Sequence, residues 1–312
     1  MLKDKIMKLN CHIIIIVVSC ILILNSSSLN AQTIAFQRND NEIWIANKNG
    51  GNPQFICNGM YPDISPNGKY IAFTAGNGIG YVNIESKEIH IFKSIRAYRS
   101  FGPKWSPNSN MIAFMCLIRP YPWGIGVVDL EDTYFHILTE GSNIRNVWAP
   151  AWGLEGKHVL CRGDGNILKI DLNGNIISKI PYKNIDLSYG IANSNRLSLS
   201  SDGNYLLFDA MVQNESIKGL PEPPISIFIH NLLTGKTTRV TPAGICALRP
   251  CWASDNKIIF EGFTEDDIRG HQGEYEYEID IDRVIYSIDI DGNNLKKLIE
   301  NAWQPSFSSG FM

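Results

Sequence analysis

The chain has 312 residues, of which 44% are hydrophobic and 19% charged, with 26 Gly and 15 Pro spread along its length. This composition excludes a disordered tail, a coiled coil and a collagen-like repeat, and it supplies enough apolar side chains for a large core. The formal net charge of −3 lacks the strong basic excess that is typical of nucleic-acid-binding proteins, so no nucleic-acid partner is expected.

The first 31 residues have the pattern of a secretory signal peptide. Three Lys near the start precede an apolar run of twelve residues from Ile13 to Leu24, and a short polar segment ends at Ala31. A membrane-spanning helix needs about 20 apolar residues, so this run is too short to be one. We therefore expect cleavage after Ala31, a periplasmic or secreted protein without a membrane span, and a mature domain over residues 32–312.

Two other fates of this leader stay open. The sequence Val17-Val-Ser-Cys20 resembles a bacterial lipobox, which would make Cys20 a lipid-modified N-terminus, although the apolar run continues past it. In the other alternative, the leader stays attached as an anchor. Removal of the leader takes away three Lys and one Asp, which leaves 25 basic against 30 acidic residues and a formal charge of −5.

The mature segment contains one repeated unit. Its first element is a short apolar strand that ends in Phe in five of six copies, and the copies begin at Gln32, Lys69, Asn110, Lys157, Asn204 and Asn256. A Pro-x-Trp element, or a degenerate form of it, precedes each internal copy. A hairpin turn that begins with Asn or Asp follows each copy, at Asn47, Asn83, Asp129, Asp171, Asn231 and Asp289. Such side chains favour turns because they bond to the backbone two residues on.

Each unit therefore supplies four short antiparallel strands, which need neighbouring units to bury both faces. The two ends of the chain complete one unit between them. The segment from Trp303 to Gly310 repeats the Pro-x-Trp element, with Phe307 in place of Trp, and Gln32 to Phe36 supplies the strand that should follow it. The sequence predicts an all-β, six-bladed β-propeller of four-stranded antiparallel blades, closed by pairing of the N- and C-terminal segments.

The five Cys of the mature segment show no disulfide framework. Their number is odd and three lie in apolar strand-like runs, so we interpret them as small buried side chains. A disulfide between Cys246 and Cys251 stays open. No C-x-x-C sequence is present, which gives no support for a zinc ribbon or a thioredoxin-type site, and no cofactor is predicted.

Two segments, 103–114 and 285–298, resemble the WD-like repeat of TolB-type propellers. The same repeat is similar to that of the propeller domains of prolyl-oligopeptidase-type peptidases and of oligogalacturonate lyases. The resemblance covers residues 32–312 and implies the propeller fold, but a propeller hosts many activities. The sequence lacks the separate N-terminal α/β domain of TolB, so the resemblance does not imply a literal role in the Tol–Pal system.

The connections between the second and third strands of the units differ most in length. Residues 37–41 form one of the shortest, whereas 116–123, 211–224 and 264–283 are long. In a propeller these connections share one face with the links between blades, so we predict that this is the binding face.

The links into each inner strand carry arginines beside aromatic residues, which together suit carboxylate, sugar-acid or peptide ligands. A surface ion-pair role for these arginines, and packing between blades for Trp148 and Trp303, are the alternatives. His271, in the acidic segment 264–282, is added because it is the one mature His in a long loop. The candidate ligand-binding residues are Tyr61, Arg99, Arg145, Arg196, Arg249 and His271.

From Glu274 to Asp282, acidic residues alternate with Tyr or Ile, which predicts a strand with one acidic and one apolar face. A protruding hairpin and a solvated extension of the blade are both compatible with it. One His among many carboxylates is poor support for a metal site, so none is predicted.

No Gly-x-Ser-x-Gly sequence accompanies the propeller, and no catalytic residue is assigned. We expect an exported TolB-like propeller that acts as a protein- or peptide-binding or scaffolding module in the cell envelope. The alternative is a carbohydrate-active enzyme, a lyase or hydrolase on acidic oligosaccharides, with its site on the loop-rich face.

Overall fold

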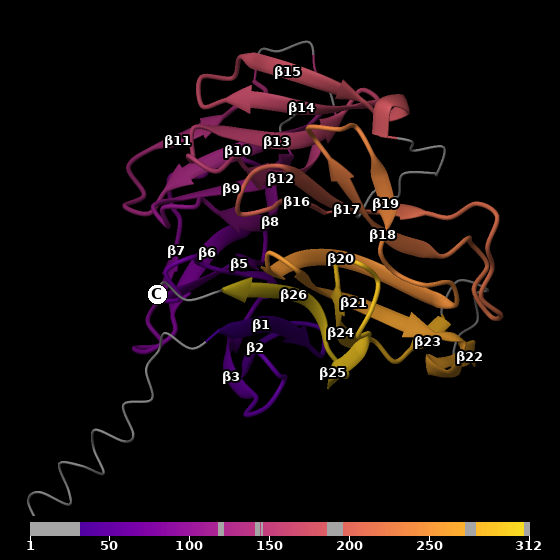
Figure 1. Cartoon of the computed structure of the whole chain (residues 1–312). Coiled ribbons are helices and arrows are strands. Elements are labelled where there is room, and N and C mark those ends of the chain that lie inside the picture. The colour runs from indigo at the N-terminus through magenta and orange to yellow at the C-terminus, as the bar shows by residue number, and fades with distance from the viewer. Residues whose placement is uncertain are drawn as a thin grey trace, which may run out of the picture.

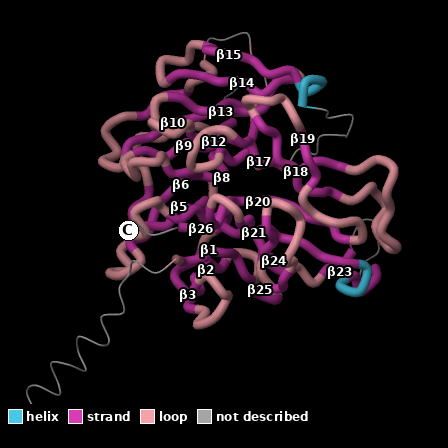
Figure 2. Tube along the Cα trace, viewed as in Figure 1, coloured by secondary structure: helices cyan, strands magenta, loops and turns pink. Residues whose placement is uncertain are grey.

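The computed structural model describes residues 32–117, 122–140, 144, 146–185, 196–271 and 279–308, without the side chains of residues 270, 271, 279 and 280. The regular elements of the described part are strands and two short 3₁₀ helices, joined by loops and turns (Figure 2). Its strands form six four-stranded antiparallel sheets around a common centre (Figure 1), and one additional two-stranded sheet. The predicted six-bladed, all-β propeller is therefore confirmed. The predicted signal peptide, residues 1–31, lies outside the described residues.

The first three blades, each taken from its inner strand outward, use the N-terminal half of the chain and its last strand. Blade 1 contains β26 (Trp303–Ser308), β1 (Thr33–Arg38), β2 (Glu42–Asn47) and β3 (Gln54–Asn58). Blade 2 contains β4 (Met60–Ile64), β5 (Tyr70–Ala75), β6 (Gly78–Asn83) and β7 (Ile89–Ile91). Blade 3 contains β8 (Arg99–Trp105), β9 (Met111–Leu117), β10 (Trp123–Asp129) and β11 (Phe135–Ile137).

The other three blades follow in chain order. Blade 4 contains β12 (Trp148–Trp152), β13 (His158–Gly163), β14 (Asn166–Asp171) and β15 (Ile176–Pro181), and η1 (Tyr182–Ile185) comes after it. Blade 5 contains β16 (Leu197–Leu199), β17 (Tyr205–Met211), β18 (Ile225–Asn231) and β19 (Thr237–Arg239). Blade 6 contains β20 (Ile245–Ser254), β21 (Lys257–Thr264), β24 (Val284–Asp289) and β25 (Lys296–Glu300).

Blade 1 closes the ring with strands from both ends of the described chain. β26 pairs antiparallel with β1, so that Ser306 lies opposite Ala35 and Ser308 lies opposite Thr33. Figure 1 shows the last strand, in yellow, beside the first one, in indigo. The predicted pairing of the two terminal segments is confirmed, and it leaves no open edge between the first blade and the last.

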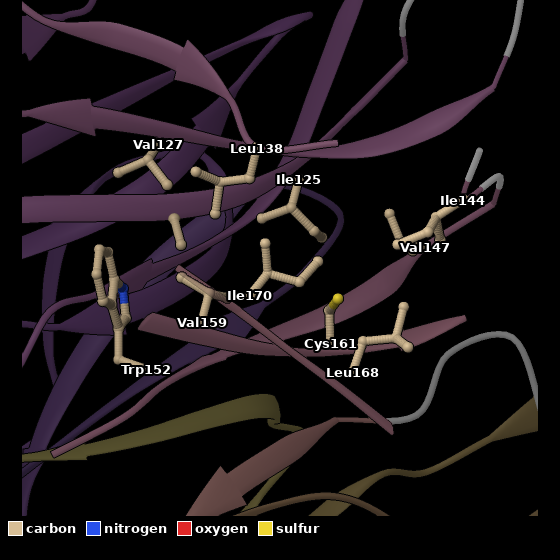
Figure 3. Close-up of a cluster of buried hydrophobic side chains, with 11 residues drawn as sticks. Ile125, Val127, Leu138, Ile144, Val147, Trp152, Val159, Cys161, Leu168 and Ile170 are labelled. Atoms are coloured by element: carbon tan, nitrogen blue, oxygen red, sulfur yellow. The ribbon is translucent and has the colours of Figure 1, made fainter. Parts of the chain in front are cut away.

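The hydrophobic core is divided into clusters that lie between neighbouring blades. Figure 3 shows the cluster between blades 3 and 4, where Ile125 and Val127 of β10 face Val159 and Cys161 of β13. The repeated strands contribute their terminal aromatic side chains to these clusters, and all are at most 2% exposed: Phe36, Phe73, Phe114, Phe208 and Phe260. Each blade thus buries both of its faces against its neighbours, which is why one unit could not fold alone.

A glycine makes room for one of these rings. Gly126 in β10 lies directly opposite Phe114 in β9, and a Cβ atom at Gly126 would come 2.7 Å from the Phe114 ring. Such an approach is too close for any side chain, so this cross-strand pair requires Gly.

The predicted Asn and Asp turns form as expected in four hairpins, where the side-chain oxygen accepts the amide two residues on at 2.9–3.0 Å: Asn47, Asn83, Asp171 and Asn231. Asp129 instead accepts the amides of Thr133 and Tyr134, both at 2.8 Å. Asp289 bonds to side chains, Lys257 at 2.5 Å and Asn294 at 2.7 Å.

The acidic segment after β21 forms an extension of blade 6. η2 (Glu265–Asp267) leads into β22 (Ile268–His271), which pairs with β23 (Ile279–Ile281) as a separate two-stranded sheet. Of the predicted alternating strand, residues 279–281 are described and lie in β23, whereas 274–278 lie outside the described residues.

The five Cys within residues 32–312 are free thiols. Cys246 and Cys251 are both in β20 without a disulfide between them, so the alternative that they pair is not realised. Burial raises the pKa of Cys246 to about 11 and that of Cys251 to about 12, which keeps both thiols protonated at neutral pH. Among the described residues, no helix is long and apolar enough to cross a membrane.

Candidate functional site

The inner strands of five blades share a backbone irregularity at the residue before the recurring Pro of the repeat. That residue has a positive φ of 52° to 60°, and the strand pairing shifts register around it. The five residues are Tyr61, Gly102, Ala149, Arg249 and Gln304. This is the geometry of a β-bulge, which takes one residue out of the ladder and re-aims its side chain.

In four of these bulges, a side chain from the preceding blade accepts the amide hydrogen that the ladder cannot use. The amide of Tyr61 donates to Gln37 Oε1 at 3.1 Å, and that of Gly102 to Thr74 Oγ1 at 3.2 Å. The same contact joins Arg249 to Asp209 Oδ2 at 2.8 Å, and Gln304 to Glu261 Oε2 at 3.0 Å. Each acceptor directly follows the buried Phe of its strand and is itself buried. A backbone amide without a hydrogen-bond partner would be costly at such a buried place, so a side-chain acceptor is needed there.

The five bulged residues and Arg196, which takes the equivalent place in blade 5, form what we call the upper ring. All six line one cavity of about 340 Å³, the mouth cavity, together with Phe101, Lys104, Met115 and Pro150. Neighbouring strands of a blade alternate in direction, so the start of each inner strand lies at the end where the second and third strands connect. The mouth cavity is therefore on the loop-rich face, which is the face that the sequence predicts to bind a ligand.

A second cavity of about 370 Å³, the side cavity, adjoins the mouth cavity through three shared residues: Tyr61, Arg249 and Gln304. Its other walls come from blades 1, 2 and 6: Gln37, Met60, Ile281, Arg283 and Trp303. Both cavities lie within the size range of small-molecule and peptide-residue pockets.

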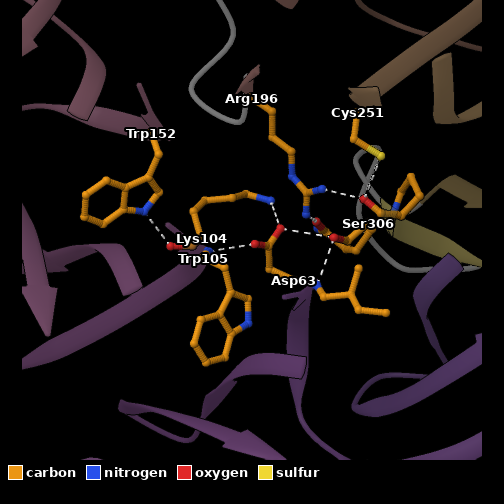
Figure 4. A network of polar contacts seen from close by, with 10 residues as sticks. Asp63, Lys104, Trp105, Trp152, Arg196, Cys251 and Ser306 are labelled. Atoms are coloured by element: carbon orange, nitrogen blue, oxygen red, sulfur yellow. Dashed lines mark hydrogen bonds and ion pairs between the residues drawn. The ribbon is translucent and has the colours of Figure 1, made fainter. Parts of the chain in front are cut away.

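Two residues further along each inner strand, a lower ring lies below the mouth cavity: Asp63, Lys104, Ala151, Ser198, Cys251 and Ser306. These six residues line a third cavity of about 370 Å³, which extends to the opposite face. Figure 4 shows the polar network at this level. Asp63 accepts hydrogen bonds from Lys104 Nζ at 2.5 Å, from Ser306 Oγ at 3.1 Å and from the Trp105 amide at 2.9 Å.

Arg196 extends this network from the opposite side of the ring. Within its described residues, Leu197–Leu199, β16 pairs with β17 without a register shift. The Arg196 guanidinium instead donates to the Pro305 carbonyl at 2.7 Å and to Gln304 Oε1 at 2.8 Å. Burial lowers the pKa of Lys104, and nearby Arg196 lowers it further, against the opposing effect of Asp63.

Glu261 holds two arginines at the border of the mouth and side cavities. Its carboxylate is fully buried and forms ion pairs with Arg249, at 2.8 Å, and with Arg283. Burial alone would raise the pKa of Glu261, but the charges of Arg249 and Arg283 and the Gln304 amide bring it below its ordinary value. Glu261 is therefore ionised at neutral pH, and it fixes the positions of both guanidinium groups.

Asp209 and Arg162 place two more charged side chains behind the upper ring. Both are buried, and Arg162 lies with its guanidinium carbon 5.5 Å from the ring centre of Tyr182. Burial raises the pKa of Asp209 from 3.8 to about 6, although the Arg249 amide and the charges of Arg162 and Arg249 oppose the shift. Asp209 thus gains its proton under mildly acidic conditions.

The structure brings together three of the predicted ligand-binding residues, Tyr61, Arg196 and Arg249, around the mouth cavity. Arg99 is exposed at the start of β8, with its guanidinium carbon 5.8 Å from the ring centre of Tyr98, and it lines neither the mouth nor the side cavity.

The other predicted residues stand elsewhere. Arg145 lies outside the described residues. The backbone of His271 ends β22 in the extension of blade 6, and its side chain is outside the described part. Trp148 packs against the core cluster between blades 4 and 5, and Trp303 lines the side cavity.

Sequence reasoning missed Lys104, Asp63, Glu261 and Gln304. A signal for them was available, because they occupy fixed places in the repeat: the x of Pro-x-Trp, the residue after the Phe, and the residue before the Pro. Aligning the six units on these places would have grouped the ring residues. Such an alignment would not have shown that the residue before the Pro has a positive φ.

In the described part of the chain, no three His, Cys, Asp or Glu side chains gather in a way that could hold a metal ion. The chemistry that the two cavities offer is that of cationic and aromatic side chains beside apolar wall residues.

No protein-family model matches this sequence, and no curated protein matches it. Solved structures do match its fold. TolB from Acinetobacter baumannii superposes with a TM-score of 0.62 at 16% identity over 89% of this chain, and this chain spans only 66% of that protein. A putative TolB from Agrobacterium tumefaciens gives 0.60 at 14% identity, over 86% of this chain and 89% of its own.

A chain in the crystal structure of a nidogen/laminin complex has a TM-score of 0.61 at 8% identity, covering 90% of this chain and 100% of its own. At such identities the similarity concerns the fold. The fold is that of a TolB-like six-bladed propeller, in agreement with the resemblance of the repeats.

Proposed function

We propose that this propeller is an exported protein- or peptide-binding module of the cell envelope, and that its partner binds on the face that carries the mouth cavity. The single observation that supports this most is the composition of the cavity walls. Lys104, Arg196 and Arg249 lie among Tyr61 and Phe101 on a rigid ring of inner strands.

Arg and aromatic side chains are enriched in protein interfaces, and binding pockets are lined mainly by apolar and aromatic side chains with a few polar groups. The two aromatic rings form one wall, since Tyr61 and Phe101 lie edge to face with ring centres 6.5 Å apart, and Phe101 continues to Trp123 at 5.8 Å. Rigid aromatic side chains lose little conformational entropy on binding, so such a wall favours recognition of a flexible partner.

The comparisons add support through the fold alone. Two of the similar structures are TolB proteins, and a third similar chain was crystallised in a complex of nidogen with laminin. A role for the present chain in protein binding is an extension from those proteins.

Site-specific photo-crosslinking in native cells tests the proposal. p-Benzoylphenylalanine in place of Phe101 puts a crosslinker in the mouth cavity. The control is the same residue in place of Leu233, which is 76% exposed in the turn between β18 and β19, on the opposite face. We expect an adduct of one defined mass from position 101 and none of that mass from position 233.

Absence of any adduct from position 101, or the same adducts from both positions, would contradict a partner-binding role for this face. Turnover of an acidic oligosaccharide by the purified protein, lost when Arg249 is changed to Gln, would instead support the carbohydrate-active alternative.

A further inference from the structure

We infer that the mouth cavity receives the free C-terminal carboxylate of an extended peptide, with Arg196 as its principal partner. The inference rests on the proposed function and adds the chemical group that is recognised.

The first step is the charge of the cavity walls. Among the described residues that line the mouth cavity, three are cations, Lys104, Arg196 and Arg249, and none is a carboxylate. The side cavity adds Arg283 and again contributes no carboxylate from the described part of the chain. Acidic residues outnumber basic ones in the whole sequence, so this cluster runs against the overall charge. Walls of one sign select a ligand of the opposite sign.

The second step is that one of these cations, Arg196, has no directly paired carboxylate in the described part of the chain. Lys104 is paired with Asp63 at 2.5 Å, and Arg249 shares Glu261 with Arg283. Arg196 bonds only to neutral acceptors, the Pro305 carbonyl and the Gln304 side chain, and no carboxylate among residues that the structure describes lies within ion-pair distance of it.

A guanidinium has five N–H donors in a planar fork, and two of those of Arg196 are used in these bonds. The neutral bonds hold the side chain in place, and the charges of Asp63 and Glu261 act on it only from beyond ion-pair distance, since each of these carboxylates is paired with another cation. A carboxylate is the group that matches the remaining donors of such a fork.

The third step is the floor of the cavity. Lys104 and Arg196 line both the mouth cavity and the cavity on the opposite face. Between these two spaces, Asp63 joins Lys104 and Ser306 of the two neighbouring blades, and Arg196 reaches across from blade 5 to the Pro305 carbonyl of blade 1 (Figure 4). A peptide that enters from the loop-rich face cannot pass this network, so it enters end-on, and the end that meets Arg196 is the one that carries a negative charge.

The fourth step distinguishes a peptide from a sugar acid, which also carries a carboxylate. Much of the remaining wall is apolar: Phe101, Met115, Ala149 and Pro150, with the ring of Tyr61. An apolar wall accommodates a terminal hydrophobic side chain, whereas the hydroxyl groups of a sugar would lose water there without gaining hydrogen bonds.

The test uses two pools of N-acetylated hexapeptides, randomised at every position and identical except at the C-terminus. One pool ends in a free carboxylate and the other in an amide. Each is passed over the immobilised, natively processed protein, and retained peptides are quantified by mass spectrometry. We expect retention of the amide pool to be about 10- to 100-fold lower, since a hydrogen bond to a charged group is lost.

Three variants sharpen the comparison. Arg196→Gln should lower retention of the free-acid pool to the level of the amide pool, and Arg196→Lys should retain an intermediate amount. Arg99→Gln, the matched control, removes an exposed arginine outside both cavities and should change nothing. If Arg196→Gln does not fold, as judged by its melting curve, the comparison of the two pools on the unmodified protein still decides.

Equal retention of both pools overturns the inference and leaves peptide binding intact. Retention of neither pool contradicts both the inference and the proposed function. Retention of an oligogalacturonate probe in place of the peptides also overturns the inference and moves support to the carbohydrate-active alternative.

Discussion

The backbone amide of Gln304 donates a hydrogen bond of 3.0 Å to the fully buried carboxylate of Glu261. Gln304 is in β26, the strand that closes the ring, and Glu261 is in β21 of the neighbouring blade. The same carboxylate holds Arg249 and Arg283 at the cavities. One side chain therefore couples closure of the propeller to the arrangement of charge at its mouth.

Replacing Glu261 by Gln should be strongly destabilising, because it leaves Arg249 and Arg283 buried or half-buried without a counter-charge. Removal of one partner of a buried ion pair costs about 3–5 kcal/mol, and exposure of part of Arg283 reduces this toward the lower end. Urea denaturation of the two proteins measures the difference. Glu155→Gln, which removes an exposed ion pair with Lys157, is the control and should leave the midpoint unchanged. Equal midpoints for Glu261→Gln and the unmodified protein would refute the coupling.

The bulges give a second prediction. Thr74 is fully buried and its hydroxyl accepts the Gly102 amide, so Thr74→Val keeps the shape of the side chain and leaves this amide without an acceptor. We expect a loss of about 1–3 kcal/mol in the free energy of unfolding. Thr238→Val, at an exposed position of β19, provides the matched control and should change stability little. A neutral effect of Thr74→Val would mean that the bulge amide finds another acceptor.

Asp209 gives a pH-dependent prediction. Burial raises its pKa from 3.8 to about 6, so between these values the folded protein binds more protons than the unfolded chain. Stability from this group is therefore greatest below about pH 4, and it is lost as the pH rises toward 6. Asp209→Asn cannot ionise, while its side-chain oxygen can still accept the Arg249 amide.

The variant should match the unmodified protein near pH 4 and become more stable than it by up to about 3 kcal/mol at pH 7. Urea titrations of both proteins at several pH values measure this difference, in which the contributions of other carboxylates cancel. A difference that does not change with pH, or one of the opposite sign, would show that Asp209 is not the titrating group.

The fold was predictable because the repeat is visible in the sequence: five copies end in Phe, and each Phe is buried between blades. The binding residues were predictable only in part. Arg249 precedes Pro250, and Arg196 takes the same place in its unit before Leu197, so the two could be grouped by spacing. Lys104 reads as the variable residue of Pro-x-Trp, and its role depends on Asp63, which is 41 residues away in the chain and 2.5 Å away in space. A contact of this kind between blades has no local signature.

Closure by β26 gives the last prediction. A chain that ends at residue 302 loses the strand that pairs with β1, and with it Gln304, which binds both Glu261 and Arg196. The edge of β1 and the apolar cluster between blades 6 and 1 would then be exposed, so we expect the truncated chain to aggregate and to lose cooperative unfolding.

A synthetic peptide of residues 303–312, added in trans, should restore a cooperative melting transition, whereas a scrambled peptide should not. Because the pairing is a backbone ladder reinforced by the contacts of Gln304, the peptide variant Gln304→Leu should rescue less well than the natural sequence. A truncated chain that unfolds with the midpoint of the full protein would show that blade 1 does not need its inner strand, and that closure contributes nothing to stability.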